Sequence, residues 1–163
     1  KLRITAHSNT IEEANKLIKP IENKLQELFG KNIFSTNNQT LAYVVIDLLR
    51  KRGETLSVAE SCTGGSLSSA ITSIPGSSDV FLGGVVAYNN KIKQDILRVP
   101  LELIEQYGAV SKPVVQSMAG SIRKTFDSDW SIAISGIAGP KGGNATKPVG
   151  RVELYIQGKQ SYE

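Results

Sequence analysis

The chain has 163 residues, of which 40% are hydrophobic and 21% charged, and its formal net charge is +4. This composition is ordinary for a globular protein. The positive charge is too diffuse to predict a nucleic-acid-binding surface, and no apolar run approaches the roughly 20 residues that cross a bilayer. The single cysteine, Cys62, excludes an internal disulfide and suits a reducing compartment, so we expect a cytoplasmic protein.

Residues 1–36 are predicted to belong to a separate unit. Residues 2–6 alternate like a strand, and residues 10–29 have the acidic first turn and apolar spacing of an amphipathic helix, which Pro20 should kink or divide. One strand and one helix cannot close a hydrophobic core. We therefore interpret this segment as the end of another small α/β domain, followed by a linker at residues 35–38. Because the chain does not begin with methionine, we expect it to be part of a longer protein.

Residues 37–163 are predicted to form a second unit in which strands and helices alternate. The apolar and amphipathic patterns predict strands at residues 55–59, 81–88, 130–135 and 152–157, and helices at residues 41–51, 64–73, 90–97, 100–106 and 112–126. Such alternation predicts an α/β fold with a sheet covered on both faces. We expect a three-layer α/β/α sandwich around a mixed, mostly parallel sheet.

The turn after the first of these strands is the most informative segment. Residues 60–65 (ESCTGG) place Ser61 where a strand passes through a turn into a helix. Junctions of this kind aim several backbone N–H groups and a positive helix end at one point, and Gly64 and Gly65 let a ligand approach the backbone closely. The pattern predicts a site for an anion or oxyanion beside a hydroxyl, and an ordinary N-capped helix is the alternative interpretation.

The histidine content limits which residue could act as the general base for Ser61. The only histidine, His7, is far in sequence from the glycine-bearing loops, which argues against a Ser-His-Asp triad and excludes a His-rich zinc site. Lysine is then the leading candidate, and Lys91 and Lys93 follow Tyr88 in the motif YNNKIK. Burial lowers the pKa of a lysine, so Lys93 could take the Ser61 proton while Tyr88 orients it. The alternative is that both lysines are solvated.

Other residues near these loops are candidates for binding a ligand. Glu60 is a candidate hydrogen-bond acceptor, Cys62 a rival nucleophile or a buried filler, and Thr63 an alternative hydroxyl. Ligands gather beyond the carboxyl ends of strands in open α/β sheets, where the later loops add Ser135, Gly136, Gly139 and Lys147. Lys147 either faces a phosphate or belongs to a surface turn. No loop matches a dinucleotide or P-loop fingerprint, and a small molecule that carries a phosphate is expected.

Several motifs, in order along the chain, resemble the CinA family (competence/damage-inducible protein A), in its C-terminal nicotinamide-nucleotide amidase domain. The motifs are AESCTGG (59–65), PGSS (75–78), YNNKIK (88–93), GAVS (108–111), SGIAGP (135–140) and KPVG (147–150). The resemblance covers about residues 39–157. Residues 1–36 resemble the C-terminal part of the KH-like middle domain of full-length members.

The resemblance implies hydrolysis of nicotinamide mononucleotide to nicotinate mononucleotide and ammonia, as in pyridine-nucleotide salvage, without a metal or other cofactor. It implies that Ser61 is the nucleophile, Lys93 the general base and Tyr88 its orienting partner. The N–H groups that would form the oxyanion hole or hold the 5′-phosphate are those of Cys62, Thr63, Gly64 or Gly65. We expect Glu60, Ser135, Gly136, Gly139 and Lys147 to lie around the substrate as well.

A second hypothesis is a non-catalytic module that binds a nucleotide or a partner protein and regulates an N-terminal ADP-ribose hydrolase domain. Family members usually continue past the last strand into a Phe-x-Gly-x-Arg segment and a terminal helix, whereas this chain stops at Glu163. We therefore expect an open sheet face or edge strand, a homodimer that uses it, and impaired activity of this chain. Residues 1–36 lack the Gly-x-x-Gly loop with which KH domains clamp nucleic acid, so no nucleic-acid partner is expected.

Overall fold

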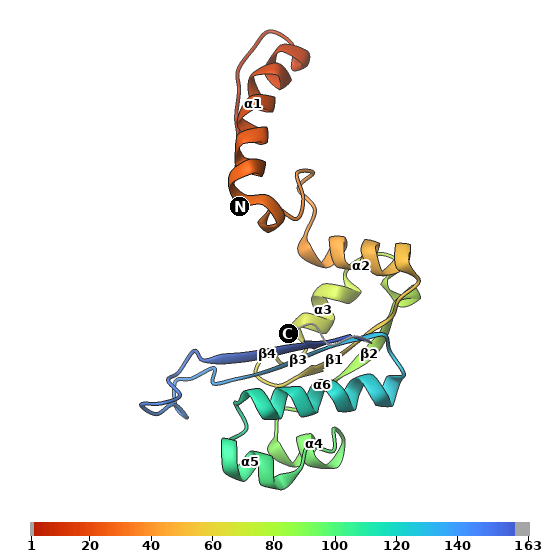
Figure 1. Cartoon of the computed structure of the whole chain (residues 1–163), viewed down its shortest axis with the longest axis vertical. Helices are drawn as coiled ribbons and strands as arrows, with labels where there is room; N and C mark the ends of the chain where they lie inside the picture. The colour runs from red at the N-terminus through yellow and green to blue at the C-terminus, as the bar shows by residue number, and fades with distance from the viewer. Residues whose placement is uncertain (1, 159–163) are drawn as a thin grey trace. The chain divides into compact units, whose positions relative to one another are not determined.

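The computed structural model of the chain describes residues 2–158 (Figure 1). Contacts divide the chain into two compact units, with the division between Val44 and Val45. The division falls inside helix α2 (Leu41–Arg52), a few residues beyond the predicted start of the second unit at residue 37. Among the described residues, no helix has both the length and the apolar content that crossing a membrane requires.

The first unit consists mainly of helix α1 (Ile11–Phe29) and a short 3-10 turn, η1 (Gly30–Asn32). The predicted start of α1 is confirmed, because Thr10 Oγ1 accepts a hydrogen bond of 3.2 Å from the Glu13 N–H. Pro20 lies inside the helix without dividing it, since α1 is continuous on both sides of this residue. No residue of α1 is buried, as expected of a segment that cannot close a core by itself.

The strand predicted at residues 2–6 is wrong. These residues have no regular structure, although they alternate in polarity as a strand would. A strand forms when its backbone N–H and C=O groups pair with a neighbour, and the described part of this unit contains no second strand. The alternation of polar and apolar residues is therefore not sufficient to predict a strand here.

The second unit is built on a four-stranded sheet with the order β2-β1-β3-β4. The strands are β1 (Leu56–Glu60), β2 (Phe81–Val86), β3 (Trp130–Gly136) and β4 (Val152–Gln157). Strand β1 runs parallel to both β2 and β3, whereas β4 is antiparallel to β3, with Ser131 opposite Gln157. The prediction of a mixed, mostly parallel sheet is confirmed.

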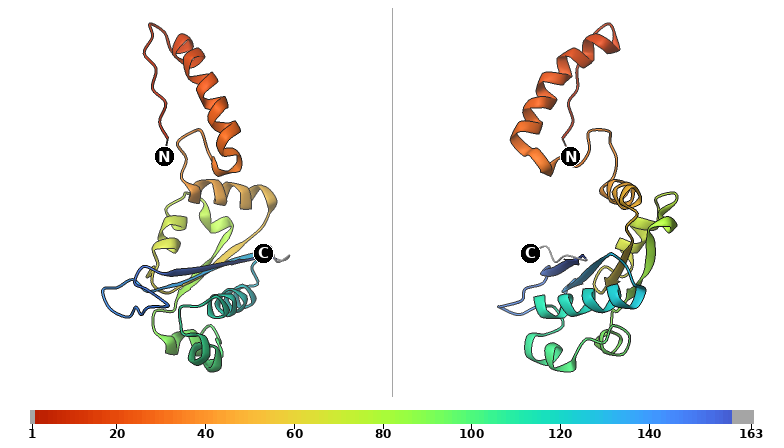
Figure 2. Two further views of the ribbon diagram at one scale, coloured as in Figure 1. Left: turned by 60° about the vertical axis from the view of Figure 1, so that its left-hand side comes forward. Right: turned by 45° about the vertical axis from the view of Figure 1, so that its right-hand side comes forward.

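Helices cover both faces of the sheet, which confirms the three layers (Figure 1, Figure 2). Successive residues of a strand point to opposite faces. On one face, Leu56 and Val58 pack in a buried cluster with α2 and α3 (Ser66–Thr72). On the other face, Ala59 packs with α6 (Lys112–Phe126), beyond which lie α4 (Asn90–Asp95) and α5 (Leu101–Tyr107).

The sheet is left partly open at β4. Val152, Leu154 and Ile156 are each about half exposed, at 56%, 55% and 48%. Ile156 pairs with Ile132, which belongs to the cluster beneath α2 and α3, so these side chains lie on that face of the sheet. Within residues 2–158 no helix covers them, as expected for an open sheet face, and the homodimer stays a prediction.

Candidate active site

Ser61 and Lys93 meet at the carboxyl edge of the parallel strands. Ser61 directly follows β1, and Lys93 lies in α4, 32 positions later. The Lys93 Nζ is 3.0 Å from Ser61 Oγ and donates a second hydrogen bond of 2.9 Å to the backbone oxygen of Ala87. Both side chains are buried, with exposures of 5% for Ser61 and 2% for Lys93. The residues predicted to form a nucleophile–base pair are therefore in contact.

The start of α4 determines which of the two lysines is buried. The Asn89 side chain caps the helix by accepting a hydrogen bond of 2.8 Å from the Lys91 N–H. Residues two positions apart lie on nearly opposite sides of a helix, about 200° apart. Lys93 thus faces the interior, while the exposed Lys91 pairs with Asp95 at 2.6 Å. The alternative of a solvated lysine is correct for Lys91 and wrong for Lys93.

The surroundings of Lys93 disfavour its charged form relative to a lysine in water. Burial lowers the pKa of the Lys93 amine below its ordinary value, and the nearby Cys62 thiol opposes this with a smaller effect. Among the described residues, no carboxylate lies within ion-pair distance of the amine. A neutral amine that donates to the Ala87 carbonyl has its lone pair free to accept the Ser61 proton. The arrangement is that of a general base next to a hydroxyl.

Tyr88 does not contribute the orienting contact predicted for it. Its side chain is 71% exposed, and within residues 2–158 Lys93 bonds to Ser61 and Ala87 but not to Tyr88. Alternation continues beyond β2, so Ala87 faces the core and Tyr88 faces solvent. The acceptor that orients Lys93 is therefore a backbone carbonyl, a group that every residue carries and that no side-chain motif reveals.

Of the four backbone N–H groups of residues 62–65, two are free to bind an oxyanion. The Gly64 N–H donates to the Ser61 carbonyl at 3.0 Å, and the Gly65 N–H donates to Glu60 Oε2 at 3.1 Å. In the part of the chain that the structure describes, the N–H groups of Cys62 and Thr63 donate to no acceptor. The structure thus reduces the four predicted N–H donors to two, both adjacent to Ser61.

Glu60 lies behind the turn and is fully buried. Its carboxylate accepts hydrogen bonds from the N–H groups of Gly65, Leu67 and Ser68 and from the Ser68 hydroxyl, at 2.6–3.1 Å. Burial raises the pKa of Glu60, but these hydrogen bonds, with a contribution from Thr63, outweigh it and hold the pKa below its usual value. These four bonds agree with the hydrogen-bond acceptor predicted for Glu60, and its contact with substrate stays a prediction.

Cys62 packs against the end of β3, and the Thr63 hydroxyl is buried in the same turn. Cys62 is half-buried beside Gly136, at the end of β3, and a Cβ at Gly136 would lie 2.7 Å from the Cys62 Sγ. Glycine at position 136 therefore lets the turn approach β3 closely. The Thr63 Oγ1 is buried and makes no hydrogen bond of ordinary geometry among the described residues.

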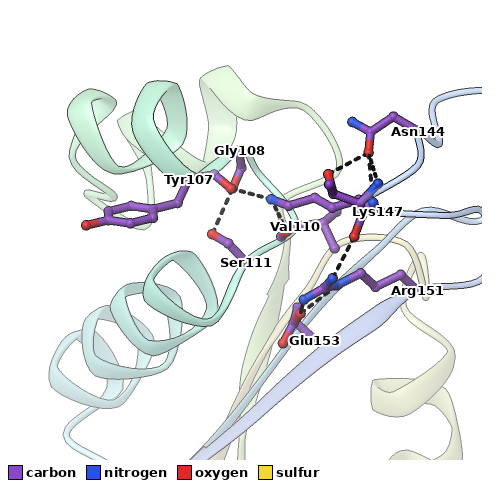
Figure 3. A network of polar contacts seen from close by, with 9 residues as sticks. Tyr107, Gly108, Val110, Ser111, Asn144, Lys147, Arg151 and Glu153 are labelled. Carbon is purple, nitrogen blue, oxygen red and sulfur yellow. Dashed lines mark hydrogen bonds and ion pairs between the residues drawn. The ribbon is translucent and has the colours of Figure 1, made fainter.

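Lys147 anchors the loop between β3 and β4 (Figure 3). Its Nζ donates to the backbone oxygens of Tyr107 and Val110, the latter at 2.7 Å. The Asn144 side chain accepts a hydrogen bond of 2.7 Å from the Lys147 N–H, which closes a tight turn around the lysine. The ammonium predicted to face a phosphate is thus bound to backbone carbonyls of the 107–110 segment.

Ser135 and Gly139 belong to the same region. The Ser135 hydroxyl donates to the Ala109 oxygen at 2.9 Å, which ties the end of β3 to the segment that Lys147 holds. Gly139 has a φ of 81° and packs so closely on Val149 that a Cβ there would lie 2.5 Å from that side chain. These residues shape the loop beyond the sheet edge, and their contact with substrate stays a prediction.

Replacing Lys147 by methionine is expected to loosen this loop. The variant loses two hydrogen bonds from a charged donor, which should lower the free energy of unfolding by about 1 kcal/mol and speed amide exchange over residues 142–150. Urea unfolding and hydrogen-exchange mass spectrometry measure the two effects. The matched control is Lys141→Met, because Lys141 is an exposed lysine of the same loop. Equal exchange in both variants would contradict the anchoring role.

Comparison with known proteins places this domain in a family. Residues 38–163 match the CinA C-terminal domain family. A CinA-like protein of Prochlorococcus marinus is 59% identical over 158 residues, covering 97% of this chain and 37% of the relative. A CinA-like protein of Parasynechococcus marenigrum is 52% identical over 163 residues, covering 100% of this chain and 39% of the relative. The chain thus spans less than two-fifths of the length of these relatives.

Solved structures give the same result for the fold. The competence/damage inducible protein CihA from Agrobacterium tumefaciens matches with a TM-score of 0.71 and 41% identity, over 73% of this chain and 72% of that one. A CinA superfamily protein from Escherichia coli matches with a TM-score of 0.72 and 33% identity, over 82% and 81% of the two chains. With its sequence, fold and family match in agreement, the chain belongs to the CinA family.

Proposed function

We propose that this domain hydrolyses the carboxamide of nicotinamide mononucleotide to nicotinate mononucleotide and ammonia. The observation that carries the proposal is the 3.0 Å contact between the buried Lys93 amine and the Ser61 hydroxyl. A buried lysine with a lowered pKa beside a serine is an arrangement suited to acyl transfer. The choice of this nucleotide rests on the resemblance to CinA amidase domains.

The geometry supports a two-step acyl transfer. Lys93 takes the Ser61 proton as Oγ bonds to the carboxamide carbon, and the resulting oxyanion is held by the N–H groups of Cys62 and Thr63. The Lys93 ammonium then protonates the leaving nitrogen, the C–N bond breaks and ammonia departs. Lys93 next takes a proton from water, which attacks the acyl carbon. Transfer of that proton to Ser61 Oγ breaks the acyl–Oγ bond, restores the free serine and releases the carboxylic acid, which loses its proton to solvent.

Ammonia release from nicotinamide mononucleotide tests this function. The assay uses the 163-residue chain and, because this chain spans only part of its relatives, the full-length Prochlorococcus marinus CinA-like protein. Nicotinamide and nicotinamide riboside are the comparison substrates. We expect kcat/KM to be about 100-fold lower for nicotinamide, because binding energy from the ribose and phosphate is used in the transition state.

Two outcomes would contradict the proposal. Equal kcat/KM for nicotinamide and its mononucleotide would exclude the nucleotide as the preferred substrate. Tight binding of nicotinamide mononucleotide without ammonia release by either protein would favour the second hypothesis, a non-catalytic module that binds nucleotides. Calorimetric titration with the nucleotide gives the binding measurement.

A further inference from the structure

Glu60 is a buried charge that the acyl-transfer steps do not use. Its side chain is fully buried, and no lysine or arginine among residues 2–158 pairs with it. Its two carboxylate oxygens each accept two hydrogen bonds: Oε2 from the Gly65 and Leu67 N–H groups, and Oε1 from the N–H and hydroxyl of Ser68. The charge is therefore stabilised chiefly by donors of residues 65–68, at the N-cap and first turn of α3. Burying a carboxylate is costly unless hydrogen bonds compensate for the lost water, as these four bonds do here.

The contacts of Glu60 close a small ring around the turn. The main chain leaves Glu60, passes through residues 61–64 and returns at Gly65, which donates 3.1 Å back to the Glu60 side chain. Helix α3 has only seven residues, too few to be stable without such support. With both ends of the 61–64 segment attached to Glu60, the backbone conformation of Ser61 depends on this carboxylate.

The ring also determines which N–H groups remain free. Glu60 accepts from the N–H groups of Gly65, Leu67 and Ser68, and the Ser61 carbonyl accepts from Gly64. Of the N–H groups of residues 62–68, which the structure describes, those of Cys62 and Thr63 are left without an acceptor, next to the nucleophile. The carboxylate thus separates the donors that hold the helix from the donors available to an oxyanion.

Strand β2 provides the space for this arrangement. Gly84 lies opposite Val58, and a Cβ at Gly84 would be 3.1 Å from Ser68 Oγ and 2.5 Å from the Val58 side chain. The absence of a side chain at position 84 lets α3 approach the sheet closely. Ser68 can then make its 2.6 Å hydrogen bond to Glu60.

We propose that Glu60 is a positioning residue for amide hydrolysis, which holds the 61–65 turn so that Ser61 faces Lys93 while the Cys62 and Thr63 N–H groups face the oxyanion. This inference rests on the proposed function. It assigns to Glu60 no contact with substrate. Its effect on the reaction passes through the backbone of the turn.

Kinetics of Glu60→Gln and Ser68→Ala test the inference in the full chain. Glutamine matches the shape of glutamate but presents an NH₂ group toward donors, so the ring is broken. We expect kcat for ammonia release to fall about 100-fold, because a misplacement of about 1 Å costs that much, while KM changes by less than about threefold. Ser68→Ala removes one of the four bonds and should lower kcat by about tenfold.

Ser69→Ala is the matched control. Ser69 is the neighbour of Ser68 on α3, and its hydroxyl makes no hydrogen bond among the described residues. Its kcat should stay within about twofold of the parent value, as expected of a substitution away from such contacts. A folded Glu60→Gln protein with unchanged kcat but a lower melting temperature would overturn the inference, because Glu60 would then serve stability alone.

Amide hydrogen exchange at residues 61–68 separates this inference from the proposed function. We expect faster exchange in Glu60→Gln and Ser68→Ala, and unchanged exchange in Ser69→Ala. If the parent protein releases no ammonia but exchange accelerates as expected, the proposed function fails and the holding role of Glu60 stands. If exchange in Glu60→Gln equals that of the parent, the holding role is refuted whatever the activity.

Discussion

Ser61→Ala is expected to reduce ammonia release at least about 10³-fold while the nucleotide still binds. Alanine removes the Oγ that bonds to the carboxamide carbon but retains the backbone, so the N–H groups of Cys62 and Thr63 keep their positions. Removing the nucleophile of a serine hydrolase leaves only the catalysis that oxyanion binding and substrate binding provide. The measurements are kcat for ammonia release and the Kd for nicotinamide mononucleotide by calorimetry.

The rival nucleophile is tested in parallel. Cys62 is the only cysteine and lies next to Ser61, half-buried and near the Lys93 amine. If Cys62→Ala loses as much activity as we expect for Ser61→Ala, and Ser61→Ala retains turnover, the thiol is the nucleophile and the assignment of Ser61 is wrong. Loss of nucleotide binding in Ser61→Ala would instead show that its hydroxyl contacts the ground-state substrate.

The sheet could be predicted because its strands and helices carry strong local patterns. The last strand has the predicted bounds, residues 152–157, and β1 is shifted by one residue from the predicted 55–59. The spacing of apolar residues within a short window of sequence is enough to predict such elements. The strand expected at residues 2–6 failed for the opposite reason, because strand formation depends on a partner that local alternation does not report.

The candidate site was predictable only in part. Ser61 could be found because a strand–turn–helix junction is encoded in consecutive residues. From the residues alone both lysines could be solvated, and the resemblance to the CinA family selected Lys93. The burial of Lys93 follows from the rotation of α4, which the Asn89 cap and the packing of the helix determine. The Ala87 carbonyl could not be found, since a backbone group leaves no sequence signal.

The same limit applies to polar side chains whose partners lie elsewhere in the chain. Lys147 follows a glycine-bearing loop. Its charge alone predicts that the ammonium binds an acceptor, but it does not distinguish a phosphate from a backbone carbonyl. Its actual partners, Tyr107 and Val110, lie 40 and 37 positions away. Glu60 shows the converse, because its donors are within eight residues, yet only the folded turn shows that all of them reach one carboxylate.

Lys93→Met is expected to abolish turnover without lowering the free energy of unfolding at neutral pH. Methionine has a similar length and no charge, so the variant loses the general base, and kcat should fall about 10²–10⁴-fold. At the same time it removes an amine whose charged form is disfavoured by burial, as its lowered pKa indicates. Loss of function without loss of stability is typical of a group retained for its chemistry. Ammonia release and urea unfolding at pH 7 measure both quantities.

The pH dependence gives the same prediction a second test. Because the pKa of Lys93 is lower in the folded protein, the unfolded chain binds more protons between that value and the ordinary lysine pKa. The contribution of Lys93 to the free energy of unfolding therefore increases with pH across this window, and Lys93→Met lacks this increase. Turnover by the parent protein should rise as the pH passes through the lowered pKa of Lys93, because the amine then loses its proton.

Lys91→Met is the matched control, because it makes the same substitution in the same helix at an exposed lysine paired with Asp95. It should keep kcat within about twofold of the parent and the same pH–rate profile, as expected of a surface change. Equal losses of activity in the two variants would show that activity depends on the total charge of α4 and not on the buried Lys93 amine. A Lys93→Met protein with full turnover would remove lysine from the mechanism, and Ser61 would then need a base that lies outside α4.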